Sequence, residues 1–142
     1  MSHTPAALAT AVVFVWLGMI LAISFLEAPL KFRAPGVTIP IGLGIGRLVF
    51  RALNAVEAVF AVVVIVAVCV GRPPVSVSVL TAVVSVVLAA QLMAIRPVLN
   101  RRSDRVLAGE NPPQSRAHLL YIGAEGVKTV ALLALGIRVL AA

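Results

Sequence analysis

The chain has 142 residues, of which 61% are hydrophobic and only 12% charged, and its net charge is +7. Soluble domains carry about 25% charged residues, so this composition excludes a soluble domain and predicts an integral membrane protein. The positive charge does not indicate nucleic-acid binding, because aromatic residues make up only 5% and no basic run is interleaved with them. The single cysteine, Cys69, excludes an internal disulfide and a CxxC metal site, and we expect neither a metal nor a cofactor.

Four apolar segments of roughly 20 residues or more are long enough to cross a bilayer as helices. The connections between them are too short to fold by themselves. The sequence therefore predicts an all-α membrane protein, a four-transmembrane-helix bundle that forms one domain over residues 1–142. The expected helices cover about 6–28, 47–70, 75–95 and 118–140.

The first helix is expected to be retained, because its apolar run is longer than the core of about 7 to 15 residues in a cleaved signal peptide. The helix ends in SFLEAPLKFRAPG, where Pro29 and Pro35 are predicted to break it. Lys31 and Arg33 mark the boundary with water, and Glu27 lies just inside that boundary.

Residues 36–46, GVTIPIGLGIG, are an apolar segment rich in glycine and proline. The spacing of the glycines matches neither the dinucleotide-binding pattern nor a Walker A loop. We expect a surface connection here, or alternatively a re-entrant loop whose backbone is covered by protein.

The second helix opens with RLVFRALNAVE, which places four polar residues in an otherwise apolar run. At about 100° per residue, Arg47, Arg51 and Asn54 fall within roughly a 60° arc, and Glu57 lies about 60° to one side. Such a stripe must face protein or water in a bilayer, never lipid. It is therefore the main candidate site.

The third helix has one strongly polar interior residue, Gln91, near an end that Arg96 and Pro97 close. A hydrophilic stretch over 100–116 follows. The fourth helix then opens with a second polar stripe at the same membrane face as the first. Its members fall within about an 80° arc and are His118, Tyr121, Glu125 and Lys128.

Basic residues are distributed unevenly between the two sides of the predicted bundle. The connections after the first and third helices hold eight Lys and Arg residues, whereas the opposite side holds only Arg72 and Arg138. The positive-inside rule places the basic connections in the cytoplasm and both termini outside. We expect a multi-pass protein of a bacterial inner (plasma) membrane.

The two halves of the chain share an order of features. Each reads as a helix, a proline-containing basic connection and a helix with a glutamate about two turns in: EAPLKFR leads to LNAVEAV, and IRPVLNRR leads to YIGAEGV. Two tandem helical hairpins of this kind would make Glu57 and Glu125 counterparts.

The general layout, with the segments EAPL and RPVLNRR and the start of the fourth helix, resembles small four-span membrane proteins of the anthrone-oxygenase-like and transmembrane-protein-205-like kind. The resemblance implies the four-span architecture. The oxygenase-like group has a tryptophan and a histidine near the last span, whereas His118 has no tryptophan nearby, so we carry over no activity.

On this topology the polar residues lie in the cytoplasmic half, where four basic residues face three acids. Guanidinium groups bind carboxylates and phosphates bidentately, so we predict a net-positive, cytoplasm-facing cavity that binds or transports an anionic or amphipathic small molecule or a lipid. Glu57 or Glu125 could exchange a proton there. The predicted ligand-binding residues are Glu27, Arg47, Arg51, Asn54, Glu57, Gln91, Arg96, His118, Tyr121, Glu125 and Lys128.

Two alternatives stay open. In the first, the chain is a structural or accessory subunit whose buried charges only fix helix packing. The pairs expected in that case are Arg47 or Arg51 with Glu57, Glu125 with Lys128, and Glu27 with Arg96. In the second, the chain is a small membrane enzyme that uses His118 and Glu125 as an acid/base group.

The sequence has no zinc-protease motif, no GxSxG elbow and no Cys-His pair, which favours the non-enzymatic alternatives. The expected partners are membrane lipids and the small molecule, and not nucleic acid. A homo-oligomer is a further alternative.

Overall fold

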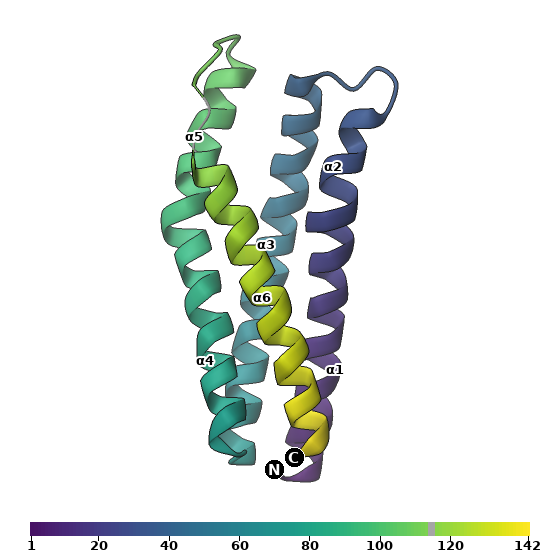
Figure 1. The fold of residues 1–142 in the computed structure, drawn as a ribbon, viewed down its shortest axis with the longest axis vertical. Helices are drawn as coiled ribbons and strands as arrows, with labels where there is room; N and C mark the ends of the chain where they lie inside the picture. Colours follow the sequence, from purple (N-terminus) through teal and green to yellow (C-terminus); the bar gives the residue numbers. More distant parts are fainter. Residues whose placement is uncertain (114–115) are drawn as a thin grey trace.

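The structure is a computed structural model that describes residues 1–113 and 116–142. Over these two ranges the chain forms four long helical spans and no strand (Figure 1). Each span is long and apolar enough to cross a membrane. The predicted all-α membrane fold, a bundle of four transmembrane helices, is therefore confirmed. The spans run over His3–Arg33, Ile39–Gly71, Val75–Leu107 and Arg116–Ala141.

Two of the spans are composites of several helix types. The first consists of α1 (His3–Ile20), the π-helical η1 (Leu21–Glu27), the short α2 (Ala28–Leu30) and the 3-10 turn η2 (Lys31–Arg33). The third consists of α4 (Val75–Ala90), the π-helical η3 (Gln91–Ile95) and α5 (Arg96–Leu107). The other two are single helices, α3 (Ile39–Gly71) and α6 (Arg116–Ala141).

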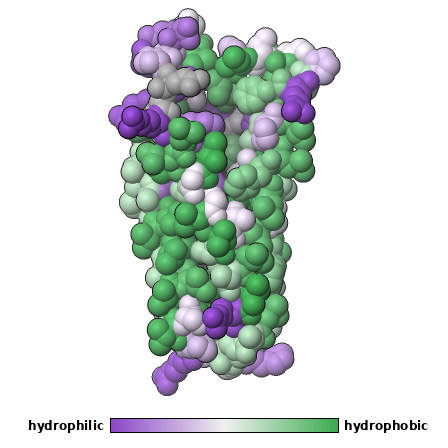
Figure 2. All heavy atoms as spheres, viewed as in Figure 1, coloured by the Kyte–Doolittle hydropathy of each residue, from purple (hydrophilic) through white to green (hydrophobic). Residues whose placement is uncertain are grey.

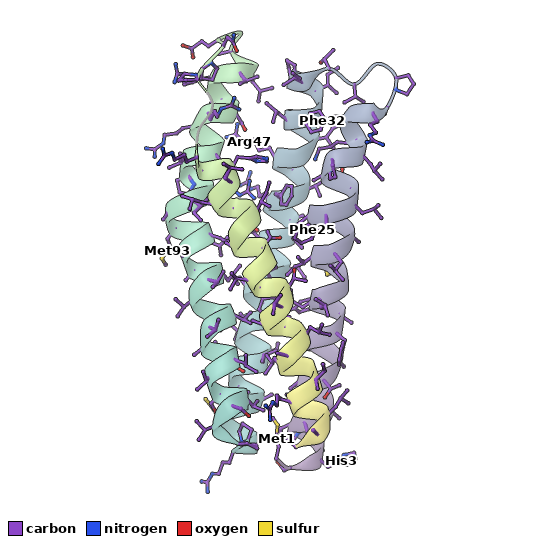
Figure 3. The ribbon with its side chains drawn as sticks, in the orientation of Figure 1. Met1, His3, Phe25, Phe32, Arg47 and Met93 are labelled. Carbon is purple, nitrogen blue, oxygen red and sulfur yellow. The ribbon has the colours of Figure 1, made fainter. Side chains whose placement is uncertain are left out.

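Apolar side chains cover most of the outer surface of the four spans, as expected of helices that face lipid. Val13, Trp16 and Leu132 are buried in the core, whereas Val75 and Met93 on the outer surface are 78% and 81% exposed. The side of the bundle is accordingly hydrophobic (Figure 2), and Met93 points outward from the bundle (Figure 3). Residues in this outer layer would contact lipid tails.

The two ends of the bundle differ. Both termini lie at one end, and the basic segments η2 and α5 lie at the other (Figure 1). Polar surface gathers at this second end, the upper end in Figure 2. α1 packs against α3 and α6, and α6 also packs against α4, so α6 crosses the bundle obliquely from the third span to the first (Figure 1). At the basic end, α6 consequently leans away from the first span.

Two prolines do not end their helices, contrary to prediction. Pro29 and Pro97 each stand near the start of a short α-helix that directly follows a π-helical segment. A proline lacks the N–H for the helical hydrogen bond and its ring crowds the preceding turn. The wider π turn is where the chain accommodates this mismatch without leaving the helix. The first span therefore extends to Arg33 and the third to Leu107.

The expected connection over 36–46 is mostly helix, because α3 begins at Ile39. Thr38 caps this helix: its side-chain oxygen accepts a hydrogen bond from the backbone N–H of Ile41 at 3.3 Å. Pro40 occupies the first turn, where the missing N–H has no intrahelical partner to lose. From Ile39 onward the segment is thus neither a surface connection nor a re-entrant loop.

Glycines in this segment let η2 lie close to α3. A Cβ atom at Gly42 would overlap the ring of Phe32, and one at Gly46 would lie 2.8 Å from the Nζ atom of Lys31. Small residues commonly allow such close approach between membrane helices. The G-L-G-I-G run therefore serves helix packing.

The arrangement of the two halves supports the tandem-hairpin prediction. Pro29 and Pro97 are 68 residues apart, and so are Glu57 and Glu125. Each proline follows a π-helical segment, and each glutamate is buried on the next span. The buried positions recur at the same spacing: Ala9, Val13, Trp16 and Ile20 of α1 correspond to Val77, Thr81, Val84 and Leu88 of α4.

Candidate functional site

A cavity of about 490 Å³ lies at the basic end of the bundle, between the first span, α3, α5 and α6. Its volume is within the range of about 300 to 1,000 Å³ that small-molecule sites have. Figure 3 shows Arg47, Phe25 and Phe32 in this upper half, on the side where α6 leans away from the first span. The polar and aromatic residues that line it include Ser24, Phe25, Lys31, Phe32, Arg47, Phe50, Arg96, His118, Tyr121 and Glu125.

Three basic side chains line the cavity, and two of them have an acidic partner. The Nζ atom of Lys31 lies 3.6 Å from the Oε2 atom of Glu27, one helical turn away. Arg47 forms an ion pair with Asp104 of α5. The third, Arg96, has no carboxylate within ion-pair distance in the described part of the chain. Arg96 is therefore the one Lys or Arg side chain of the three on this wall without an ion-pair partner among the described residues.

Aromatic rings hold Arg96 in place. Its guanidinium carbon lies 4.4 Å from the ring centroid of Tyr121 and 5.0 Å from that of Phe50, both within cation-π range. The two rings themselves meet edge to face with centroids 5.8 Å apart. The Nε and Nη2 atoms of Arg96 are buried and have no hydrogen-bond partner among residues 1–113 and 116–142. Arg96 thus lines the cavity as a stacked guanidinium, and two of its donors are buried without a partner among the described residues.

A polar cluster lies inside the bundle beside the cavity, and all four spans contribute to it. Lys128 of α6 forms an ion pair with Glu57 of α3 and lies 2.7 Å from the Oε1 atom of Glu125. Trp16 of α1 donates its indole N–H to Glu57 at 2.9 Å, and Gln91 of η3 donates its amide to Glu125 at 2.8 Å. These five residues are all buried and are called the buried polar cluster below.

Two hydrogen bonds connect the cavity wall to the interior. Ser24 of η1 donates its hydroxyl to Glu125 at 2.5 Å, and both residues line the cavity. Tyr121 donates its hydroxyl to the side-chain oxygen of Asn54 at 3.4 Å. Glu125 therefore belongs both to the cavity wall and to the buried polar cluster.

The eleven predicted ligand-binding residues separate into three groups. Those that line the cavity are Arg47, Arg96, His118, Tyr121 and Glu125. Those that are buried in the interior are Asn54, Glu57, Gln91 and Lys128. Those that lie outside both are Glu27, which pairs with Lys31, and Arg51.

The predicted pairing of Glu57 with Arg47 or Arg51 is wrong, because Lys128 occupies that place. Arg51 is exposed. At about 100° per residue it lies about 120° from Glu57 around α3, too far to share the buried face. The predicted pairing of Glu125 with Lys128 is confirmed.

The predicted pairing of Glu27 with Arg96 is also wrong. Glu27 pairs with Lys31 on the next turn of its own span, and Arg96 stacks on Tyr121. Because the first span continues as helix past Pro29, Lys31 is placed one turn from Glu27 and becomes the nearer cation.

Several residues of the site were missed from the sequence. Trp16 is the only tryptophan, and a buried indole N–H usually finds an acceptor, which was the available signal. Ser24, Phe50 and Asp104 gave no such signal, because serines and phenylalanines are common in apolar helices and Asp104 lies in a hydrophilic stretch.

Among the residues that the structure describes, no three His, Cys, Asp or Glu side chains are grouped so that they could hold a metal ion.

Comparison of the chain with protein-family models, with curated proteins and with solved structures finds no match. What the chain does has to follow from the geometry of the cavity and of the buried polar cluster.

Proposed function

We propose that the chain is a small polytopic membrane protein whose cavity binds or transports an amphipathic anion, a molecule with a carboxylate, phosphate or similar headgroup and an apolar body. The proposal rests on the environment of Arg96. Its guanidinium faces the cavity without an acidic partner among the described residues, and two of its buried donors are unpaired.

An anion would satisfy these donors. A guanidinium presents parallel N–H groups that match the two oxygens of a carboxylate or phosphate. Tyr121 and Phe50 fix the plane of the guanidinium, which lowers the entropy lost when a headgroup binds. Lys31 and Arg47 add positive charge to the same wall, although each is already paired. This arrangement favours an anion over a neutral or cationic ligand.

The remaining wall favours an apolar body. Phe25, Phe32, Leu43 and Ile122 line the cavity, and Phe25 and Phe32 are 43% and 41% exposed. These two phenylalanines are both exposed and part of the cavity wall, so the cavity borders the outer surface of the bundle, at the end where α6 and the first span diverge (Figure 1). A hydrocarbon chain in this position would keep contact with apolar surface while its headgroup reaches Arg96.

Three probes with a shared design test the proposal. Dodecanesulfonate has a charged headgroup and a chain, dodecanol has the chain alone, and methanesulfonate has the headgroup alone. We expect native mass spectrometry of the purified protein to show binding of dodecanesulfonate but not of dodecanol. Binding of methanesulfonate as well would identify the source as a soluble anion, whereas its failure would identify a lipid-like one.

The matched variants are Arg96→Gln and Arg51→Gln, which remove the same charge from the cavity and from the exposed face of α3. A hydrogen bond to a charged group is worth about 1.5 to 3 kcal/mol, so Arg96→Gln should weaken dodecanesulfonate binding about tenfold or more. Arg51→Gln should leave it unchanged. Equal effects of the two substitutions, or equal binding of dodecanol, would refute the proposal.

The structural alternative is favoured by the buried polar cluster, whose ion pairs join α3 to α6 and whose hydrogen bonds reach α1 and η3. That alternative predicts that no probe binds and that Arg96→Gln lowers stability instead.

The enzymatic alternative required His118 and Glu125 to act together. His118 is exposed at the cavity wall, and the side-chain oxygens of Glu125 accept hydrogen bonds from Ser24 and Gln91.

We also propose that the basic end faces the cytoplasm of a bacterial inner membrane, so that both termini lie outside. The charge bias between the two ends of the bundle supports this orientation. Single cysteines at Ser2 and Ser103, in a background without Cys69, should react with an impermeant reagent from opposite sides, with Ser2 labelled in intact cells. Labelling of both positions from outside would rule the topology out.

A further inference from the structure

The buried polar cluster contains two carboxylates and one ammonium group. The side chains of Glu57 and Lys128 are 0% exposed, and that of Glu125 is 2% exposed. With both glutamates ionised, these three groups carry one negative charge in excess inside the bundle. An uncompensated buried charge is strongly unfavourable. A single bound proton makes the cluster neutral.

The hydrogen bonds around Glu57 leave one place for that proton. The Oε2 atom of Glu57 is contacted by both Lys128 and Trp16, whereas its Oε1 atom is buried and has no partner in the described part of the chain. Both oxygens of Glu125 already accept hydrogen bonds from neighbouring side chains. Since the other three carboxylate oxygens already accept hydrogen bonds, Oε1 of Glu57 is the oxygen that can take a proton without displacing a donor.

Lys128 and Glu125 connect this carboxylate to the cavity. Glu125 lines the cavity, and its Oε1 atom lies 2.7 Å from the Nζ atom of Lys128, which also contacts Glu57. Charges interact more strongly in a protein interior than in water. A negative headgroup beside Arg96 therefore repels the ionised cluster and is repelled less by the neutral one.

We infer that the cluster formed by Glu57, Lys128 and Glu125 is a proton-binding site coupled to the anion in the cavity, so that the bound proton and the bound anion favour each other. The inference rests on the proposed function and specifies what the protein takes up: an anion together with a proton. Linkage makes the coupling reciprocal: the factor by which the proton raises anion affinity equals the factor by which the anion raises proton affinity.

Other groups around the two carboxylates bear on their charge. Lys128 of α6 contacts both carboxylates, and Tyr121 of α6 and Arg96 of α5 line the cavity together with Glu125. The neutral donors to the two carboxylates are Trp16 of α1, Ser24 of η1 and Gln91 of η3. His118 also lines the cavity, and its imidazole is another ionisable group there. The test must therefore distinguish His118 from the cluster.

Trp16 provides the reporter. It is the only tryptophan in the chain, and it donates its indole N–H to Glu57, so its emission follows the state of that carboxylate. The full-length protein in phosphatidylcholine nanodiscs is titrated from about pH 9 to about pH 5, with and without dodecanesulfonate, whose own charge is constant in this range. We expect one transition in the emission, and dodecanesulfonate should move its midpoint to higher pH. The affinity for dodecanesulfonate should rise about fivefold or more over the same range.

Three variants assign the transition. Glu57→Gln should abolish it and make dodecanesulfonate binding independent of pH. His118→Gln should retain it, and so should Glu110→Gln, which removes an exposed carboxylate paired with Arg105. If Glu57→Gln does not assemble, Glu125→Gln gives the same test, because it also leaves one carboxylate for one ammonium.

Each result supports or overturns a separate part of the inference. Emission that is flat across the range in the unmodified protein overturns the proton site. A transition that dodecanesulfonate does not move, although the probe binds, overturns the coupling and leaves the proposed function standing. Absence of dodecanesulfonate binding at every pH overturns the proposed function and the coupling with it. A transition lost in His118→Gln and kept in Glu57→Gln assigns the proton to the histidine and overturns the inference.

Discussion

Replacing Lys128 by methionine removes the one cation that two buried carboxylates share. At an effective dielectric constant of about 20, the attraction between unit charges 2.7 Å apart, as for Lys128 and Glu125, is about 6 kcal/mol. Much of this is offset by the cost of burying the charges, and removal of one partner from a buried pair typically destabilises a protein by about 3 to 5 kcal/mol. We expect Lys128→Met to lower the free energy of unfolding by that amount or more, because Glu57 loses its ion pair as well.

The assay is reversible unfolding in mixed detergent micelles, followed by the emission of Trp16. Arg138→Met is the matched control, because it makes the same change at an exposed position of α6 and should stay within about 0.5 kcal/mol of the unmodified protein. The triple variant Lys128→Met, Glu57→Gln, Glu125→Gln should recover most of the loss, since neutral side chains of similar size leave no uncompensated charge. If Lys128→Met behaves like Arg138→Met, or if the triple variant is no more stable than the single one, the charge-pairing argument is refuted.

Two further predictions concern packing and the rim of the cavity. A Cβ atom at Gly136 would lie 2.7 Å from the tip of the Phe14 ring, whereas one at Gly123 would meet open space. Because the Phe14 ring has to move, Gly136→Ala should be about 1 kcal/mol less stable than Gly123→Ala in the same unfolding assay. Equal stabilities of the two variants would contradict the packing. The ion pair between Arg47 and Asp104 joins side chains that are 39% and 57% exposed, so a double-mutant cycle on it should give a coupling below about 1 kcal/mol that vanishes at high salt, and a larger coupling that persists in salt would contradict its exposed character.

Hydropathy and the cost of polar groups in lipid were enough to predict the four spans and the inward position of most polar side chains. Glu57, Gln91, Glu125 and Lys128 are all buried, as their place in apolar helices required. The pairing of Glu125 with Lys128, one turn apart on the same helix, was predicted, but the partners on other helices were not predictable in the same way. Such pairing depends on how each helix is rotated about its axis, and tertiary packing sets that rotation. The arc of polar residues on the second predicted helix could not show by itself that Arg51 is exposed on the outer surface.

Three of the span ends at the basic end of the bundle were missed for a local reason, whereas the predicted bounds at the other end agree with the structure within three residues. Proline and glycine signals predicted breaks in the helices at Pro29 and across 36–46. The π-helical η1 accommodates Pro29 within the first span, and the Thr38 cap lets α3 begin inside 36–46. Lys31 is consequently one turn from Glu27, and α5 brings Asp104 to Arg47, two pairs that the shorter predicted helices could not form.

The length of α3 has a consequence for where the cavity sits in the membrane. Its 33 residues extend about 50 Å at 1.5 Å per residue, whereas the hydrocarbon layer is about 30 Å thick. If the terminal end of the bundle is level with one edge of that layer, about 20 Å of α3 stands beyond the other edge, at the depth of the headgroups and outside them. Arg47 then lies among headgroups, and Glu57 lies within the hydrocarbon. The thickness of the bilayer would therefore affect function. In a thicker bilayer the mouth of the cavity would lie among the acyl chains and not among the headgroups, and different molecules would reach Arg96 without any change in the protein.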